Sequence, residues 1–343
     1  MRVRSVSAFT AALLLSAASA FASTADIDKA FESLNGTLTE VVPESTIQLG
    51  VWSDAYIGKL FPSLPPHFGA GVSAGGTFIE TKALSNAIGT IITEINSHAA
   101  GATADFNFTV PDQIPLPSAS VHVRIGGFIL PFDIGVYGAY FDLNTLKFED
   151  FTGTVNYYTI GGDIRYAIMK GSTTLPKLSV GAGYIRTHLA LSMTGASKYN
   201  ADLTSYGIPG ITTVPITANA DTNTSFDLNT IFVQAQISKK FLILTPYAGV
   251  RAYVTSSKSH YDYSYSTAYE HGGTLYHVPH PDARGSSSGD YGTDTFNFDW
   301  NNIRPQLYAG LGLNLLFINC TVGGSWNMRN NLLSANVNVY IKI

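Results

Sequence analysis

The last twelve residues constrain the fold more than any other stretch of this chain. Alternate positions from 333 to 343 are all apolar, whereas the positions between them are mostly polar: Leu333, Ala335, Val337, Val339, Ile341 and Ile343 against Leu332, Ser334, Asn336, Asn338, Tyr340 and Lys342. Successive side chains of a strand point to opposite faces, so this stretch predicts a strand with one apolar face and one polar face. About 9–11 residues with this alternation span a bilayer as one strand of a barrel.

The same period of two recurs along the chain and predicts an all-β protein, a transmembrane antiparallel β-barrel. The predicted strands are 47–57, 67–79, 119–129, 132–141, 154–169, 177–191, 225–238, 242–255, 304–315, 318–328 and 332–343. Because single-chain bacterial barrels have an even number of strands, we expect one more at 105–110, giving about 12 strands within a range of 10–14. Links at 130–131, 170–176, 239–240 and 316–317 are short, and those at 142–153, 192–224 and 256–303 are long. This alternation is typical of periplasmic turns and extracellular loops.

Two segments have helical rather than strand spacing. In residues 23–46, Ile27, Ala30, Phe31 and Leu34 recur at helical intervals, which predicts either a plug-like helix that gates the barrel or a loose N-terminal extension. In residues 82–100, Leu84, Ile88, Ile91, Ile92 and Ile95 form one apolar stripe. This stripe predicts a second short helix in an insertion, packed at the barrel mouth or lying on a surface loop.

The N-terminus and the composition point to export. Arg2 and Arg4, an apolar run at 8–18 and the small residues Ala20 and Ala22 predict a signal peptide at 1–22. The predicted organisation is therefore 1–22 signal peptide, 23–46 plug or extension and 47–343 barrel. Only 13% of the residues are charged and 45% are apolar, which fits a barrel with an apolar exterior in the outer membrane of a diderm bacterium. The expected partners are outer-membrane lipids and the barrel-assembly machinery.

Charge argues against one class of partner. Without Arg2 and Arg4, 18 Lys and Arg remain against 24 Asp and Glu, a net charge of −6. No strongly basic surface is left, so nucleic acid is not an expected partner.

The inward positions of the predicted strands give the candidate site, a polar lining along the path of a substrate. Three arginines in this lining could hold an anionic group such as a carboxylate. The alternative is that they pair with Asp133 and Asp163 as structural salt bridges. The predicted lumen-lining residues are His122, Arg124, Asp133, Tyr137, Asp163, Arg165, Tyr247, Arg251, Tyr253, Gln306 and Asn314.

Neither catalysis nor a cofactor is predicted. Gly71-Val72-Ser73-Ala74-Gly75 matches G-x-S-x-G, but that motif needs a strand-to-helix turn and this one lies within a strand pattern. The histidines of the 256–303 loop (His260, His271, His277 and His280) match no tight metal motif. The lone Cys320 excludes an intramolecular disulfide. We therefore predict no enzyme, no metal and no cofactor.

Residues 241–250 (FLILTPYAGV) and 178–184 (LSVGAGY) resemble segments of bacterial outer-membrane barrels similar to the long-chain fatty-acid transporter family. The resemblance implies a barrel with an N-terminal plug-like segment and passive uptake of small hydrophobic or amphipathic molecules, with a small hydrophobic ligand as cargo. The alternative that we keep is a structural or adhesive surface-exposed barrel without a transport role, favoured by the long Tyr- and Ser-rich loop at 256–303.

Overall fold

The computed structural model describes residues 24–60, 67–80, 113–127, 130–148, 151–202, 213–271, 274–277 and 284–343. One α-helix, α2 (Thr24–Ile47), runs directly into a short 3₁₀ turn, η1 (Gln48–Gly50). The strands are β1 (Phe68–Glu80), β2 (Gln113–Gly126), β3 (Phe132–Phe148), β4 (Phe151–Lys170), β5 (Lys177–Asp202), β6 (Thr213–Ser238), β7 (Leu244–His271), β8 (Thr274–His277), β9 (Arg284–Thr293), β10 (Arg304–Leu315), β11 (Ile318–Asn327) and β12 (Leu333–Lys342).

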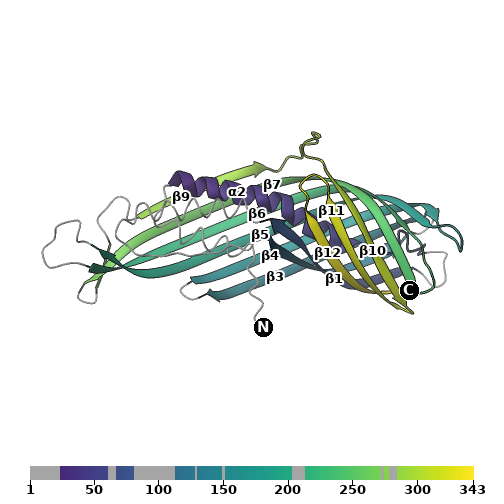
Figure 1. Cartoon of the computed structure of the whole chain (residues 1–343), viewed down its shortest axis with the longest axis horizontal. Helices are drawn as coiled ribbons and strands as arrows, with labels where there is room; N and C mark the ends of the chain where they lie inside the picture. The colour runs from purple at the N-terminus through teal and green to yellow at the C-terminus, as the bar shows by residue number, and fades with distance from the viewer. Residues whose placement is uncertain are drawn as a thin grey trace.

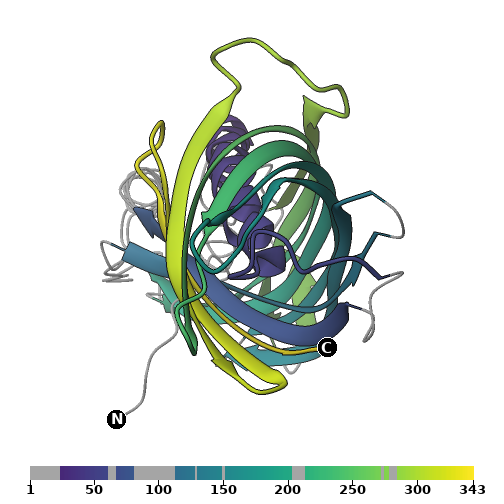
Figure 2. The same cartoon turned by 90° about the vertical axis from the view of Figure 1, so that its right-hand side faces the viewer.

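Ten of these strands close into an antiparallel barrel. The order around the wall is β10-β11-β12-β1-β2-β3-β4-β5-β6-β7, and β7 pairs with β10 to complete the ring. The first and last strands of the chain, β1 and β12, pair with each other from Gly69↔Lys342 to Phe78↔Leu333. Figure 2 looks into this ring and shows α2 inside it. The predicted antiparallel barrel is therefore confirmed.

The predicted number of about twelve strands is not confirmed for the barrel wall. Twelve strands occur among the described residues, but β8 and β9 pair with β7 outside the ring. The predicted strand at 47–57 is wrong: this stretch is the end of α2, then η1, then an extended segment without strand pairing. Its side chains alternate in polarity as in a strand, but all are buried, because the segment lies inside the barrel rather than in its wall. The strand expected at 105–110 lies outside the described residues.

The alternation of the wall strands is confirmed. In β12, Val337 is 48% exposed on the outer face, whereas its neighbour Asn338 is 0% exposed on the inner face. The outer faces of the other wall strands carry exposed apolar side chains in the same way, among them Val121, Ile164, Val250 and Leu311. The barrel thus has an apolar exterior and a mainly polar interior, the reverse of a water-soluble protein.

The two ends of the barrel differ in length. Short links at 171–176, 239–243 and 316–317, together with the C-terminus, mark one end, which we call the short-turn end. At the other, the long-strand end, β5, β6 and β7 continue to 26, 26 and 28 residues and form the extension at the left of Figure 1. Much of the predicted long loops is therefore strand. The paired polar and aromatic side chains there continue the period of two beyond the apolar band.

The helix α2 contacts β1, β2, β6, β7 and β9 along its length. Its C-terminal half and the following segment lie within the ring (Figures 1 and 2). Among the described residues, no helix has both the length and the hydropathy to cross a membrane. The predicted signal peptide at 1–22 and the predicted helix at 82–100 lie outside the described residues, so both stay predictions.

Candidate functional site: the filled lumen

A continuous stretch of the N-terminal region fills the lumen. Every residue from Val41 to Ile57 is buried, and we call residues 41–57 the internal segment. Gly50 permits a close approach of the segment to the wall, because a Cβ there would lie 2.6 Å from the ring of Tyr137. The chain therefore needs glycine where η1 ends against β3.

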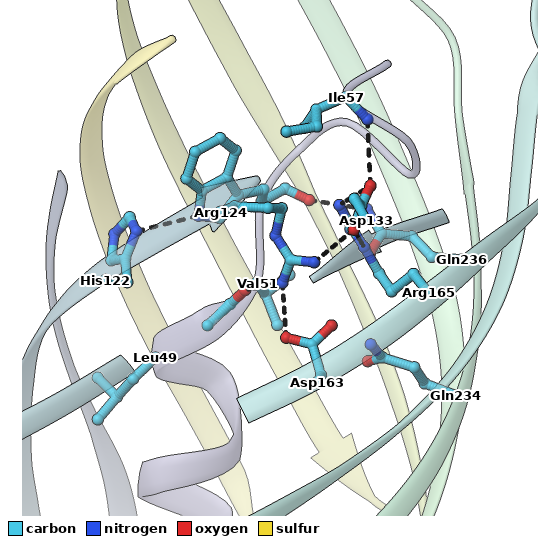
Figure 3. Close-up of polar contacts among 12 residues, drawn as sticks. Leu49, Val51, Ile57, His122, Arg124, Asp133, Asp163, Arg165, Gln234 and Gln236 are labelled. Carbon is cyan, nitrogen blue, oxygen red and sulfur yellow. Dashed lines mark hydrogen bonds and ion pairs between the residues drawn. The ribbon is translucent and has the colours of Figure 1, made fainter. Parts of the chain in front are cut away.

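Four charged side chains from three neighbouring strands form an ion-pair network on the inner face of the wall. Arg124 on β2 donates to Asp133 on β3 and to Asp163 on β4, both at 2.6 Å. Arg165 on β4 donates through Nε and Nη2 to the two oxygens of Asp133, at 2.8 and 3.1 Å. All four are buried, and Figure 3 shows Arg124 between the two carboxylates. Two positive and two negative charges balance, as buried charges require.

This ion-pair network also holds the internal segment. Arg165 Nη1 donates to the carbonyl of Asp54 at 3.0 Å, and Arg124 Nη2 to that of Gly50 at 3.4 Å. The backbone N–H of Ile57 donates to Asp133 Oδ2 at 3.2 Å, a contact drawn in Figure 3. The network therefore replaces the strand ladder that the extended residues 51–57 lack.

Glu44 on α2 anchors the helix to the opposite wall. Its carboxylate, 0% exposed, accepts hydrogen bonds from the Tyr253 hydroxyl, from Gln306 Nε2 at 2.5 Å and from Asn327 Nδ2. Burial raises the pKa of the Glu44 carboxyl, and these three donors, with Arg251 nearby, offset part of the rise. We call this the Glu44 anchor.

A second carboxylate anchors the segment near the short-turn end. Asp54 forms ion pairs with Lys177 of β5, at 2.7 Å, and with Lys342 of β12. Burial opposes ionisation of Asp54, but the two ammonium groups outweigh it and hold the pKa of this carboxyl below its usual range. We call this the Asp54 anchor. It joins strands that lie on different sides of the ring.

Between the anchors, aromatic packing fixes Trp52. Its indole stacks on Tyr340 with ring centroids 4.1 Å apart, and its N–H donates to His122 Nδ1 at 3.0 Å. Two backbone carbonyls here also accept hydrogen bonds. Asn338 Nδ2 donates to the Val51 carbonyl at 2.8 Å, and Gln236 Nε2 donates to the Trp52 carbonyl at 2.8 Å. The segment is thus held by polar contacts along its whole length.

The structure brings every predicted lining residue to the interior, and each is buried. Of the charged and polar ones, Arg124, Asp133, Arg165, His122, Arg251, Tyr253 and Gln306 contact the internal segment directly. Tyr137 and Tyr247 belong to apolar clusters with Ile47 and Val51, respectively. Asp163 reaches the segment only through Arg124, and Asn314 binds Thr245 and the carbonyl of Ile243 at the short-turn end. Whether they line a substrate path stays a prediction.

The room left by inward glycines is taken by tyrosines. A Cβ at Gly249 would collide with the Tyr308 ring, and one at Gly310 or Gly323 with the Tyr247 hydroxyl. Two hollows of about 910 and 990 Å³ do occur, but they lie mainly against outward-facing residues such as Val250 and Leu307. They are grooves of the outer wall rather than parts of the lumen.

Sequence reasoning missed Asp54 and Trp52 as site residues because 47–57 is predicted as a wall strand. It missed Glu44 because the helical pattern of 23–46 is drawn only from Ile27 to Leu34. The available signal was the isolated acidic residue within an otherwise uncharged stretch, once at position 44 and once at 54. An acidic group in such a stretch needs a buried partner.

The G-x-S-x-G stretch lies in a different local structure from the one that its motif needs, and the histidines of the 256–303 loop that the structure describes form no metal site. Ser73 lies within β1 and donates to the Leu49 carbonyl at 2.9 Å, so G-x-S-x-G is not at a strand-to-helix turn. His260 pairs with Asp290 at 2.9 Å, and His280 lies outside the described residues. No group of three or more His, Cys, Asp or Glu side chains in the described ranges is placed to bind a metal.

Comparison with known proteins gives a family and distant barrels. Residues 124–341 match the family described as "Family of unknown function (DUF6588)". No curated protein matches the chain. Among solved structures, the toluene transporter TbuX of Ralstonia pickettii has 9% identity and a TM-score of 0.24, over 80% of this chain and 88% of that one. The translocator domain of autotransporter NalP from Neisseria meningitidis has 8% identity and a TM-score of 0.31, over 80% and 87%. The toluene transporter TodX of Pseudomonas putida has 8% identity and a TM-score of 0.26, over 88% and 96%. At these scores the likenesses carry no functional argument.

Proposed function

This chain belongs to the DUF6588 family of unknown function, and we propose its function from the geometry of the barrel. It is an outer-membrane barrel, closed by its own internal segment, that passes small amphipathic or hydrophobic molecules when the segment moves. Transport would be passive, down a concentration gradient. The observation that carries the proposal is the unbroken burial of residues 41–57 inside a closed ring of strands.

The exterior supports the membrane location. Exposed apolar side chains cover the outer face of the wall strands, and a water-soluble protein would not leave so large an apolar surface uncovered. Each of the ten wall strands is paired with a neighbouring strand on both sides, so the ring is closed, as spanning a bilayer with strands requires. The short turns indicate the periplasmic side and the long strands the cell exterior.

The way the lumen is filled supports gating rather than a permanent pore. The internal segment makes no strand ladder with the wall; it is held by individual contacts from wall side chains, such as those to Glu44, Ile57 and Asp54. Such contacts can be exchanged for contacts with water or with cargo, whereas a β-ladder is lost only cooperatively. The Glu44 and Asp54 anchors would therefore decide how readily the lumen opens.

The lining supports amphipathic cargo over purely apolar cargo. When the segment moves, the exposed wall presents Arg124, Arg165 and Arg251 beside the tyrosines. Asp133 and Asp163 neutralise the first two, which matches the salt-bridge alternative, but Arg251 contacts the neutral Gln234 and Gln306. Arg251 is thus the arginine best placed to meet an anionic head group.

Flux through reconstituted protein tests this function. Vesicles carrying the wild-type barrel should take up octyl sulfate, an amphipath that stays charged at neutral pH, while conducting ions poorly. Removal of residues 24–57 should raise ion conductance strongly, because the ring would then enclose water. Arg251→Gln should slow uptake of octyl sulfate more than uptake of the uncharged amphipath octyl glucoside. Absence of uptake by the wild type, together with unchanged conductance after the deletion, would contradict the proposal.

The second candidate is a surface-exposed adhesive barrel, and the extension of β6, β7 and β9 beyond the wall favours it. Replacing residues 262–290 by a short Gly-Ser linker should then abolish adhesion and leave flux unchanged. The two functions are separable because the extension and the internal segment are altered independently.

A further inference from the structure

Two turns at the short-turn end contain leucine in a backbone conformation that leucine rarely adopts. In the β6–β7 turn, Phe241 and Leu244 exchange backbone hydrogen bonds at 2.7 and 2.8 Å around a two-residue loop whose first residue, Leu242, has φ = 53°. In the β10–β11 turn, Leu315 pairs with Ile318 around Leu316, which has φ = 54°. Glycine or asparagine normally occupies such positions, because a Cβ is strained there.

These two leucines are also almost completely exposed, Leu242 at 93% and Leu316 at 94%. Their neighbours in the loops, Ile243 and Phe317, are exposed as well. We call 241–244 and 315–318 the leucine-tipped turns. Local strain combined with an exposed apolar tip gives no benefit to the isolated barrel, so it indicates contact with something else.

Other turns of the same chain show what the backbone alone would select. The β11–β12 turn, at the long-strand end, has its positive φ at Asn331, and the β4–β5 turn has it at Gly171. Both are residues that tolerate this conformation. In the part of the chain that the structure describes, leucine therefore has a positive φ at only two turns, both at the short-turn end of the barrel.

The leucine-tipped turns lie beside each other and form one surface. The backbone N–H of Asn314 donates to the Ile243 carbonyl at 2.7 Å, which joins the second turn to the first. From both turns the exposed apolar face continues without a polar residue into the outer wall, through Leu244 and Val250 on β7 and Leu311 on β10. The tips are thus the end of the lipid-facing band rather than a separate patch.

The charges around this surface are positive. Lys240 precedes the first turn and is exposed, as is Lys170 at the end of β4, while Lys239 reaches back to the carbonyls of Thr173 and Leu175. Within the described residues, the acidic side chains nearest this end are Asp54 and Asp133, and both are buried and ion-paired. Exposed lysines beside apolar tips are complementary to a leaflet of anionic phospholipid, because the apolar tips can contact the acyl chains and the lysines can contact the anionic head groups.

We propose that the leucine-tipped turns insert into a leaflet of anionic phospholipid and anchor the short-turn end of the barrel in it. The inference rests on the membrane location under the proposed function. The turns then do not project into water: Leu242 and Leu316 lie among the acyl chains at the interface, and the lysines lie at the level of the phosphates. The strain at the two leucines is offset by the transfer of their side chains out of water.

Fluorescence quenching can locate the turns. In a Cys320→Ser background, single cysteines at Ile243 and at Phe317 are labelled with an environment-sensitive fluorophore, and the full-length barrel is reconstituted in phosphatidylethanolamine and phosphatidylglycerol vesicles. Lipids with a shallow doxyl group should quench both labels, and aqueous iodide should not. A label at Asn331, at the opposite end, should show the reverse. A label at Val250, in the middle of the wall, should be quenched by deep doxyl lipids.

Matched variants separate apolarity from backbone strain. Leu242→Asn together with Leu316→Asn relieves the strain and removes the apolar tips, and it should lower doxyl quenching about twofold or more. Leu242→Met together with Leu316→Met keeps both the strain and the apolar surface, and it should leave quenching unchanged. Heat-dependent gel mobility verifies that each variant is folded.

Each outcome decides between the alternatives. Quenching of the turn labels by iodide would place the turns in water and overturn the inference. Protection from both quenchers would indicate a protein partner or a second copy of the chain, and would also overturn it. Equal insertion into pure phosphatidylcholine would refute the role of anionic lipid. Failure of the Val250 label to meet lipid would refute the membrane location itself, whereas a lipid-facing Val250 with exposed turn labels would refute only this inference.

Discussion

Glu44→Ala removes an acceptor that three side chains of the barrel wall share, and we expect it to release the C-terminal turns of α2 from the wall. Tyr253, Gln306 and Asn327 come from β7, β10 and β11, and all donate to the Glu44 carboxylate. Alanine leaves these donors facing an apolar methyl group in a buried site. The barrel strands themselves lose no backbone pairing, so the effect is confined to docking of the helix.

The free-energy cost of Glu44→Ala depends on which hydrogen bonds the three donors retain in the variant. Gln306 retains a hydrogen bond to Ser325 at 3.1 Å, and Asn327 retains one to the Tyr253 hydroxyl at 3.0 Å. The loss is therefore smaller than three orphaned groups would give, about 3 kcal/mol for the removal of one buried, hydrogen-bonded carboxylate. This free energy raises the ratio of undocked to docked helix by roughly a hundredfold.

The rate of cysteine modification measures this ratio. Val42 lies half a turn from Glu44 on α2 and is 4% exposed, so Val42→Cys in a Cys320→Ser background reacts with a polar maleimide only when the helix leaves the wall. We expect Glu44→Ala to accelerate labelling by roughly a hundredfold when undocking limits the reaction. The folded barrel should still migrate as a compact species on unheated gels.

Glu40 provides the matched control on the same helix. It pairs with Arg304 at 3.0 Å, but its side chain is 43% exposed, so Glu40→Ala should cost less than about 1 kcal/mol and change labelling little. Labelling that is equally fast in the Glu40 and Glu44 variants, or unchanged in both, would refute the view that the Glu44 anchor holds the helix.

Three further predictions concern the other contacts of the internal segment. Asp133→Asn leaves Arg124 and Arg165 with one carboxylate between them and should cost about 3–5 kcal/mol, seen as a lower temperature for the heat-dependent gel shift; an unchanged temperature would exclude a structural role for the ion-pair network. Trp52→Ala should cost about 3–5 kcal/mol by leaving a cavity against Tyr340, whereas Trp52→Phe, which keeps the stacking, should cost only about 1 kcal/mol in the same assay; equal losses would contradict this. Acid should act in opposite directions at the two anchors. Burial raises the pKa of Glu44 above 4.5, so docking of the internal segment at the Glu44 anchor strengthens as the pH falls through that raised pKa. Lysines hold the pKa of Asp54 below 3.8, so docking at the Asp54 anchor is at full strength above pH 3.8 and weakens only as the pH falls further. The emission of an environment-sensitive fluorophore attached to a cysteine near each anchor, recorded between pH 7 and pH 3, measures both directions, and parallel changes at the two anchors would disprove the assignment.

The sequence by itself determined the wall of the barrel. Each strand residue has only two choices of face, and a lipid exterior with a polar interior turns that choice into a visible period of two. The residues predicted to point inward, from His122 to Asn314, are accordingly all buried in the structure. The sequence also allowed Arg–Asp salt bridges to be predicted as an alternative, because opposite charges buried in the same lumen pair with one another.

Only the tertiary structure decided what fills the lumen. The alternation at 47–57 is that of a wall strand, yet every side chain there is buried, since the segment is surrounded by the wall instead of belonging to it. Its anchors join Glu44 to Asn327 and Asp54 to Lys342, pairs separated by 283 and 288 residues. No local periodicity encodes such partners. They meet because closing the ring brings β7, β10, β11 and β12 around a helix from the other end of the chain, and burial then requires each charge to find the donor that faces it.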